Sequence, residues 1–135
     1  MQTTIVIMTR WPATGRCKRR LASKIGDTAA SSIQKRLTSH TVTVVNELVQ
    51  EGLVDVQLAI SGLACRAANR WGRDLGVKIV SPQGEGCLGV RMRKQVLIVQ
   101  NRFQAQEWGG RTTILLGSDL PGLCKKDILK AIHGL

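Results

Sequence analysis

Short apolar segments alternate with longer amphipathic segments along the chain. Residues 3–8 (TTIVIM) are β-branched or apolar throughout, which is typical of a strand buried on both faces of a sheet. Residues 55–60, 77–80 and 112–116 are further apolar runs of strand length. We therefore predict four strands.

Between these runs the apolar residues have helical spacing. We predict a long helix from Asp27 or Thr28 to about Glu51, with a polar cap at its start and Gly52 at its end. Three more helices are predicted at residues 64–75, 87 to about 108 and 125–132, with a helical turn at 21–25. The apolar stripe of the long helix is expected to contain Ile33, Leu37, Val44, Val45 and Leu48.

Strands that alternate with helices through short loops predict a parallel α/β sheet. A chain of 135 residues and 14.7 kDa suits one domain, spanning residues 1–135. Right-handed crossovers would place the strands in the order three-two-one-four. Ligands of such sheets bind beyond the carboxyl ends of the strands. The candidate ligand-binding loops are therefore residues 9–20, 81–91 and 117–123.

The predicted fourth strand has a consequence for association. The strand order leaves it at an edge of the sheet, yet its residues 114–116 are apolar without alternation, which suits a central strand better. An exposed apolar edge favours pairing with another chain. We therefore expect a homo-oligomer, or a partner chain that completes the sheet.

The composition narrows the choice of partner. A hydrophobic content of 43% excludes a disordered chain. The net charge of +11, from 20 Lys and Arg against 9 Asp and Glu, predicts an anionic partner: nucleic acid, anionic lipid or a phosphorylated small molecule. With no Tyr, one Phe and three Trp, the chain offers few platforms for stacked bases, which disfavours nucleic acid.

Targeting signals and cysteine spacing point to the cytoplasm. The apolar runs are too short to span a bilayer, and the first of them precedes its cations, unlike the arrangement of a secretory signal. None of the four cysteines forms a CxxC pair, which disfavours a zinc site. We expect reduced, mostly buried thiols at Cys17, Cys65, Cys87 and Cys124.

The loop after the first strand carries most of the excess charge. A turn that contains Gly15 lets backbone N–H groups approach an anion, and the start of the following helix adds a favourable dipole. Lys18 and Arg20 can donate charge-assisted hydrogen bonds to phosphate oxygens. The loop lacks the second glycine of a P-loop. We predict phosphate binding here, with a solvated basic loop as the alternative.

The other two loops carry weaker signals. Asp119 follows the fourth strand, where a carboxylate can hold a divalent cation that bridges phosphates. A helix cap or an Asx turn is the alternative role for this residue. Gly84, Gly86 and Gly89 allow a ligand to approach the backbone closely, or make an ordinary flexible loop.

Taken in order, the three loops read R-x-P-x-x-G-x-x-K-x-R-L, Q-G-x-G-x-L-G-x-R-M and G-S-D-x-P-x-L. This order resembles the small GT-A-like glycosyltransferases described as radical-SAM/selenodomain-associated transferases. They are similar in turn to the guanylyltransferases of molybdenum-cofactor and phospholactate biosynthesis. The resemblance implies a three-layer nucleotide-diphospho-sugar transferase fold of the GT-A, Rossmann-like type. It also implies that residues 1–135 are the N-terminal nucleotide-binding part and lack the acceptor-binding C-terminal portion.

The resemblance also implies a set of site residues. Asp119 would hold Mg²⁺ or Mn²⁺. Arg10 stands where the family has Lys, and Thr14, Arg19 and Cys87 replace its usual proline, threonine and acidic residue. The residues implied to bind the nucleotide or its phosphates are Arg10, Pro12, Gly15, Lys18, Arg20, Gln83, Gly84 and Arg91.

We therefore expect a transferase that uses a nucleotide-activated donor, first of all a metal-dependent glycosyltransferase that binds a nucleotide diphosphate sugar. The metal and the cations would stabilise the charge that develops on the departing nucleoside diphosphate. Three alternatives stay open: a guanylyltransferase-like nucleotidyltransferase, a catalytically incomplete nucleotide-binding domain, and a basic nucleic-acid-binding module. No acceptor-activating base is assigned, because the C-terminal portion is expected to supply it.

Overall fold

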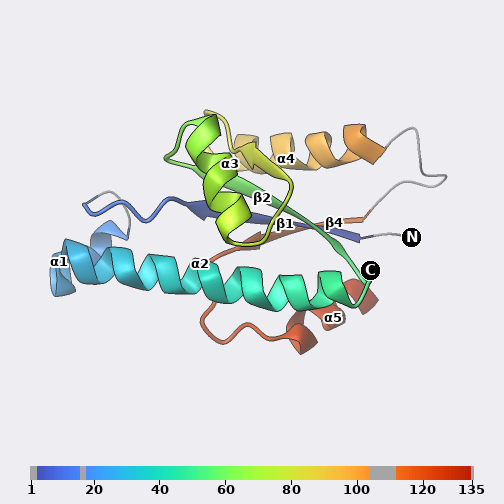
Figure 1. Cartoon of the computed structure of the whole chain (residues 1–135), viewed down its shortest axis with the longest axis horizontal. Helices are drawn as coiled ribbons and strands as arrows, with labels where there is room; N and C mark the ends of the chain where they lie inside the picture. Colours follow the sequence, from blue (N-terminus) through green and yellow to red (C-terminus); the bar gives the residue numbers. More distant parts are fainter. Residues whose placement is uncertain (1–2, 16–17, 104–111, 135) are drawn as a thin grey trace.

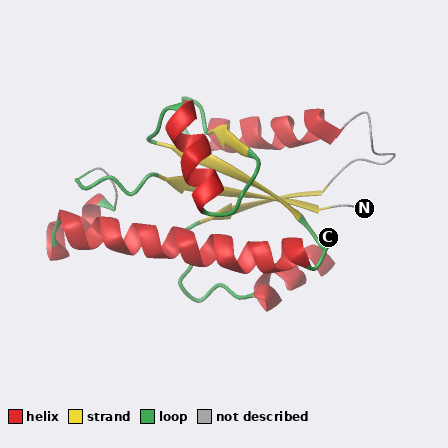
Figure 2. Cartoon of the chain, in the orientation of Figure 1, coloured by secondary structure: helices red, strands yellow, loops and turns green. Residues whose placement is uncertain are grey.

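The computed structural model describes residues 3–15, 18–103 and 112–134. Four parallel strands form one sheet between two layers of helices (Figure 1, Figure 2). The strands are β1 (Thr3–Arg10), β2 (Asp55–Ser61), β3 (Val80–Pro82) and β4 (Thr112–Gly117). The helices are α1 (Arg19–Ile25), α2 (Asp27–Gln50), α3 (Cys65–Asp74), α4 (Leu88–Phe103) and α5 (Lys125–His133).

The strand order is β3-β2-β1-β4, which confirms the predicted order and places β4 at an edge. The helices α2, α3 and α5 pack on one face of the sheet, and α4 packs on the other (Figure 1). The order of strand addition reverses at β1, because the connection from β3 to β4 crosses the opposite face. In open α/β sheets this reversal is where ligands bind.

Two element boundaries differ from the prediction. The third strand is Val80–Pro82 rather than residues 77–80. Gly76 has a positive φ of 82°, and the Val77 N–H donates to the Gly72 carbonyl, so the chain is still turning out of α3 there. Val77 is buried in the core from this turn, which is why its segment resembles a strand. The fourth helix ends at Phe103, and the predicted remainder lies outside the described residues.

The two faces of the sheet have different cores. Ile5 and Ile7 of β1 face the larger core, where buried side chains of α2, α3 and α5 meet the sheet. Val6 faces the other side and packs with Ala59 and Val99 in a small cluster. The rest of that second layer contains buried polar side chains, among them Gln57, Ser81 and Gln95, which hydrogen-bond to one another.

The buried stripe of α2 was only half predicted. Its C-terminal half contains Val45 and Leu48 as expected. Its N-terminal half is polar, with Gln34, Thr38 and Thr41 buried, whereas Ile33 and Leu37 are only half-buried. The polar half lies beneath the carboxyl end of β1, where hydroxyl groups need partners. Buried polar atoms of β1 therefore select polar residues on the facing helix.

The last helix is attached to α2 by polar contacts. Lys125 Nζ donates to Glu51 Oε1 at 2.9 Å, and this hydrogen bond raises the pKa of Lys125 above its usual value. A hydrogen bond of 2.9 Å joins His40 Nε2 to the Leu123 carbonyl. The Cys124 N–H donates to the Asp127 carboxylate, which lowers the pKa of Asp127. These contacts place the segment after β4 against the same helix that carries the polar stripe.

The expected burial of the thiols is wrong for the described cysteines. Cys65, Cys87 and Cys124 are exposed and free, because each stands at or beside the first residue of a helix rather than in a core segment. Cys17 lies outside the described residues. Within the part of the chain that the structure describes, no helix is long and apolar enough to cross a membrane.

Gly72 supplies a stability prediction. It is buried in α3, and a Cβ there would overlap Cγ2 of Val80, a β-branched side chain with little freedom to rotate. We expect Gly72→Ala to destabilise the fold by about 1–3 kcal/mol. Gly89→Ala is the matched control, because nothing lies within 4 Å of its Cβ position in α4. It should be neutral or stabilise the helix by about 0.5–1 kcal/mol. Equal urea midpoints for the wild type and Gly72→Ala would contradict the packing.

Candidate functional site

A cleft of about 520 Å³ lies at the carboxyl ends of the strands. This size is within the range of small-molecule sites. Residues from both faces contribute, because the cleft lies where the strand order reverses. Its lining residues are Met8, Thr9, Arg10, Lys18, Gln34, Ser61, Gln83, Leu88, Arg91, Met92, Leu115, Leu116, Gly117, Ser118 and Asp119.

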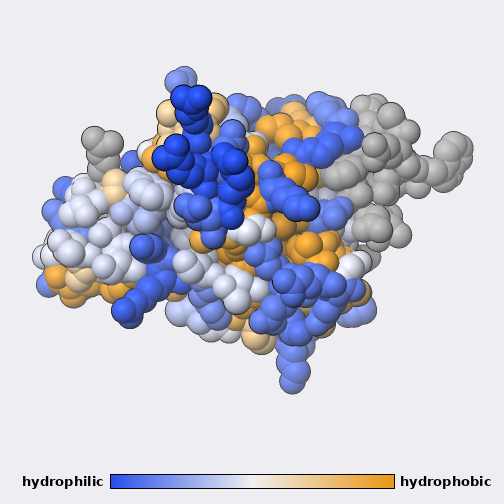
Figure 3. All heavy atoms as spheres, viewed as in Figure 1, coloured by the Kyte–Doolittle hydropathy of each residue, from blue (hydrophilic) through white to orange (hydrophobic). Residues whose placement is uncertain are grey.

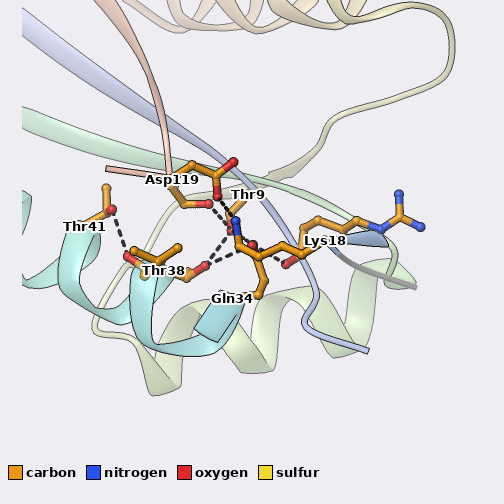
Figure 4. A network of polar contacts seen from close by, with 9 residues as sticks. Thr9, Lys18, Gln34, Thr38, Thr41 and Asp119 are labelled. Carbon is orange, nitrogen blue, oxygen red and sulfur yellow. Dashed lines mark hydrogen bonds and ion pairs between the residues drawn. The ribbon is translucent and has the colours of Figure 1, made fainter. Parts of the chain in front are cut away.

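Thr9 forms the floor of the cleft and holds three segments together (Figure 4). Its hydroxyl lies 2.8 Å from the Thr38 hydroxyl on α2 and 3.1 Å from the Ser118 hydroxyl after β4. Gln34 Nε2 donates to the Arg10 carbonyl at 3.3 Å. Thr9 is only 3% exposed, so these bonds are shielded from water. They connect the ends of β1 and β4 to the polar stripe of α2.

Gln83 closes the floor on the other side. Its Nε2 donates to the carbonyls of Thr9, at 2.9 Å, and Ala59, at 3.1 Å. The side chain is therefore wedged between the ends of β1 and β2. Its Oε1 accepts a hydrogen bond of 2.7 Å from Arg91 Nη1 on α4. Gln83 uses both of its N–H bonds and its carbonyl on the protein itself.

Arg91 is a half-buried cation of the cleft wall. Its Nε is buried and has no hydrogen-bond partner. No ion pair joins it to an acid among residues 3–15, 18–103 and 112–134. A buried N–H without a partner costs about 1–3 kcal/mol in general. The wall therefore contains an unmatched donor on a charged group.

Lys18 and Asp119 form an ion pair across the cleft mouth (Figure 4). Lys18 Nζ donates to Asp119 Oδ1 at 2.6 Å. The lysine side chain is 18% exposed and the aspartate side chain 71% exposed, so the carboxylate is on the solvent side of the pair. Lys18 precedes α1 with a φ of 46°, a left-handed conformation that is rare for residues other than glycine and clusters at functional sites.

Five of the predicted site residues line one cleft: Arg10, Lys18, Gln83, Arg91 and Asp119. They include three cations and one carboxylate, which makes the cleft a site for anions. This convergence could not be seen in the sequence, because it depends on the register of three parallel strands. The lining residues that the sequence reasoning missed include Thr9, Gln34 and Ser118. The polar residues at helical spacing from Gln34 onward were the one available signal for them.

The other four predicted residues do not line the cleft. Pro12 follows Trp11, whose ring packs edge-on against Trp71 of α3 at 4.9 Å between centroids. Gly15 has a φ of 82°, and its carbonyl accepts a hydrogen bond from Arg19. Arg20 is exposed on α1. Pro12 and Gly15 therefore shape the first loop, and Arg20 lies outside the cleft.

Gly84 has a different neighbour from the expected ligand. Its φ of 86° suits glycine, and a Cβ on it would lie 2.6 Å from Nζ of Lys94 on α4. The missing side chain thus makes room for the tip of a lysine. This close approach involves the protein's own cation.

The donor set at Asp119 suits a cation only in part. The described residues contain no group of three or more His, Cys, Asp or Glu side chains that could hold a metal ion. Asp119 is the one carboxylate among the cleft-lining residues. Mg²⁺ is commonly bound by one or two carboxylates together with substrate phosphates and water. The residues therefore fit a cation that arrives with a phosphorylated ligand.

Positive charge also lies outside the cleft. Arg66, Arg70 and Arg73 are exposed along the outer ridge of α3, whose surface is strongly hydrophilic (Figure 3). Their spacing of four and three residues puts them on one helical face. The net charge of +11 is thus not a measure of the charge in the cleft.

Comparison with known proteins is consistent with this architecture. Residues 43–135 match the sequence profile of the family described as "Uncharacterized protein conserved in bacteria (DUF2064)". The chain belongs to the DUF2064 family. A crystal structure from Desulfovibrio desulfuricans G20, named as a "putative nucleotide-diphospho-sugar transferase", superposes with a TM-score of 0.71 at 21% identity. The match covers 98% of this chain and 54% of that chain, so this chain spans about half of its length. No curated protein matches the sequence.

This similarity concerns the fold of the DUF2064 chain. It confirms the predicted α/β class and the nucleotide-diphospho-sugar transferase type of sheet. The cleft described above lies at the reversal of strand order in that sheet.

The Thr9 hydroxyl provides a test of how the floor is held. We expect Thr9→Val to destabilise the protein by about 1–3 kcal/mol, because the buried hydroxyls of Thr38 and Ser118 lose a partner while the side-chain shape is kept. Thr43→Val is the matched control: its hydroxyl also accepts or donates within α2, toward the Ser39 carbonyl, but it is exposed. Its effect should stay within about 0.5 kcal/mol. Equal losses in the two variants, by denaturant unfolding, would contradict a special role for Thr9.

Proposed function

We propose that the cleft binds the nucleoside diphosphate part of a nucleotide-activated donor, and that the chain is the donor-binding part of a glycosyltransferase. The observation that carries this proposal is the convergence of three cations and a single carboxylate on one cleft where the strand order reverses. Cations at such a position match the phosphates of a nucleotide. The relationship of fold to a structure named as a nucleotide-diphospho-sugar transferase supports the choice of ligand class.

Lys18 and Arg10 are the residues proposed to contact the diphosphate. Both line the cleft at the end of β1, and Lys18 reaches across it to Asp119. When a diphosphate binds, the ammonium of Lys18 exchanges a carboxylate oxygen for a phosphate oxygen. Cations placed there stabilise the negative charge that grows on the diphosphate as the glycosyl bond breaks.

Asp119 is the residue proposed to hold a divalent cation, Mg²⁺ or Mn²⁺, together with the phosphates. Its carboxylate is 71% exposed and paired only through Oδ1 in the described contacts, which leaves Oδ2 open to a ligand. The cation, when bound, neutralises charge on the departing diphosphate. Lys18 is near enough to Asp119 to keep the carboxylate oriented toward the cleft before the nucleotide arrives.

The apolar lining has a separate role in this proposal. Met8, Leu88, Met92 and Leu115 lie in the same cleft as the cations. Leu88 is 56% exposed although it is large and apolar. An apolar surface beside a charged one suits a ligand with an uncharged, partly apolar portion, such as the base or sugar of a nucleotide.

A thermal-shift screen of nucleotides and nucleotide sugars, with and without Mn²⁺, tests the ligand class. A ligand at 100 times its dissociation constant stabilises the folded state by about 2.7 kcal/mol. Nucleoside diphosphates should raise the midpoint more than monophosphates. Stabilisation by any polyanion without nucleotide preference, falling steeply with salt, would contradict the proposal and favour a nucleic-acid-binding module. A donor incubated with the chain distinguishes glycosyl transfer, which releases a nucleoside diphosphate, from nucleotidyl transfer, which releases pyrophosphate.

Lys18 can be compared with a cation nearby. We expect Lys18→Ala to weaken nucleoside diphosphate binding by about 1.5–3 kcal/mol, the range for a hydrogen bond to a charged group. Arg20→Ala is the control, because it removes one positive charge two residues away and outside the cleft. It should change affinity by much less. Titration calorimetry that finds equal losses in the two variants would show that only overall charge matters.

Asp119 provides the test of the cation. We expect Asp119→Asn to remove most of the Mn²⁺-dependent part of nucleotide affinity, because the cation loses its protein carboxylate. Binding without Mn²⁺ should be equal or stronger, since Lys18 is then free of its carboxylate partner. The comparison needs four titrations, each protein with and without Mn²⁺. Equal Mn²⁺ dependence in the two proteins would contradict a role for Asp119 in holding the cation.

A further inference from the structure

Arg91 differs from the other cations of the cleft in its partners. Lys18 is neutralised by Asp119, whereas the polar contact of Arg91 in the described structure is with a neutral amide, Gln83. Arg91 Nε is buried and unpartnered, and no hydrogen bond joins its Nη2 to another described residue. The fold has therefore brought a positive charge into the cleft wall without supplying an anion.

The orientation of this guanidinium is set by the protein. Both N–H bonds of Gln83 are committed to backbone carbonyls, so the Gln83 oxygen must face Arg91. That oxygen accepts from Nη1 at 2.7 Å. Arg91 is thereby held through one nitrogen, on one side of its planar group.

The opposite side of the guanidinium is the one made by Nε and Nη2. Their N–H bonds are parallel, and they match two oxygens of a phosphate or a carboxylate. Nε is also the atom that lacks a partner. We infer that the Nε–Nη2 edge of Arg91 is a two-point binding subsite for an oxyanion of the ligand, and that Gln83 is a positioning residue that holds this edge toward the cleft.

The inference deepens the proposed function and rests on it for the choice of a phosphate group as the oxyanion. It assigns Gln83 a role different from the ligand contact expected from the sequence, since Gln83 has no N–H left for a ligand. It also makes the site specific for arginine. A lysine at position 91 would keep the positive charge but could not offer two parallel donors.

Binding of inorganic pyrophosphate to the whole chain tests the subsite. We expect Arg91→Lys to weaken pyrophosphate binding at least about tenfold, in the range for a lost charge-assisted hydrogen bond. The direct readout is the ¹H–¹⁵N signal of Arg91 Nε, assigned by its loss in Arg91→Lys. This signal should shift when pyrophosphate is added to the wild type, because the unpartnered N–H gains an acceptor.

Gln83→Met tests the positioning role, because it keeps the side-chain length and removes the polar contacts. It should weaken pyrophosphate binding and make the additional loss from Arg91→Lys smaller than in the wild type, since the two residues act as a unit. Gln57→Met is the matched control, a buried glutamine on the neighbouring strand whose hydrogen bonds do not reach Arg91. It should lower stability and leave the affinity of the folded protein unchanged.

The outcomes separate this inference from the proposed function. If pyrophosphate binds and Arg91→Lys retains wild-type affinity, or the Nε signal does not shift, the subsite is wrong while the nucleotide proposal stands. If pyrophosphate does not bind but malonate does, with the same dependence on Arg91, the oxyanion subsite stands and the nucleotide proposal fails. If neither anion binds, both fail. Failure of Gln83→Met to fold leaves the Arg91→Lys comparison and the Nε signal to decide.

Discussion

The cleft depends on the hydrogen bonds that meet at Thr9. The hydroxyl of this residue bonds to Thr38 and Ser118, and its carbonyl accepts from Gln83. These partners come from α2, from the segment after β4 and from the segment after β3, which are far apart in the sequence. Because Thr9 is buried, each of these polar groups must find its partner within the protein. One residue at the end of the central strand therefore sets the relative positions of the three loops.

The two layers beside the sheet contribute in different ways. On the side of α2, α3 and α5 a continuous apolar core supplies most of the buried hydrophobic surface. On the side of α4 the apolar cluster is small, and hydrogen bonds among Gln57, Ser81 and Gln95 hold the helix. Hydrogen bonds are directional, whereas apolar packing is not. The helix that carries Arg91 is therefore placed by orientation-dependent contacts, which suits an element that must present one side chain accurately.

Charge is distributed unevenly within the cleft. The ion pair of Lys18 with Asp119 neutralises one end, and the half-buried guanidinium of Arg91 leaves the other end positive. Lys18 also has a backbone conformation that costs energy outside glycine. Both features are unfavourable for the isolated fold and favourable once an anion is present. The stability of the protein and its affinity for an anion are thus linked through the same residues.

The amino-acid sequence by itself determined the elements and their order. Residues 3–8 and 112–116 have no polar face, which left strands covered on both sides as their only interpretation. Alternation with helices and the right-handed crossover rule then allowed the strand order β3-β2-β1-β4 to be predicted. Local spacing also indicated where Lys18 and Asp119 would follow their strands.

Only the tertiary structure decided which of those residues act together. Arg20 is two positions from Lys18 in sequence but lies outside the cleft, because α1 turns it away. Gln83 resembled a ligand contact in its motif, yet both of its N–H bonds are taken by carbonyls of strands that are distant in the chain. The polar half of α2 was overlooked because its apolar residues at similar spacing carried the stronger signal. The physical reason is common to these cases: helical and strand periodicity are local properties, whereas a hydrogen-bond partner is decided by the long-range register of the sheet.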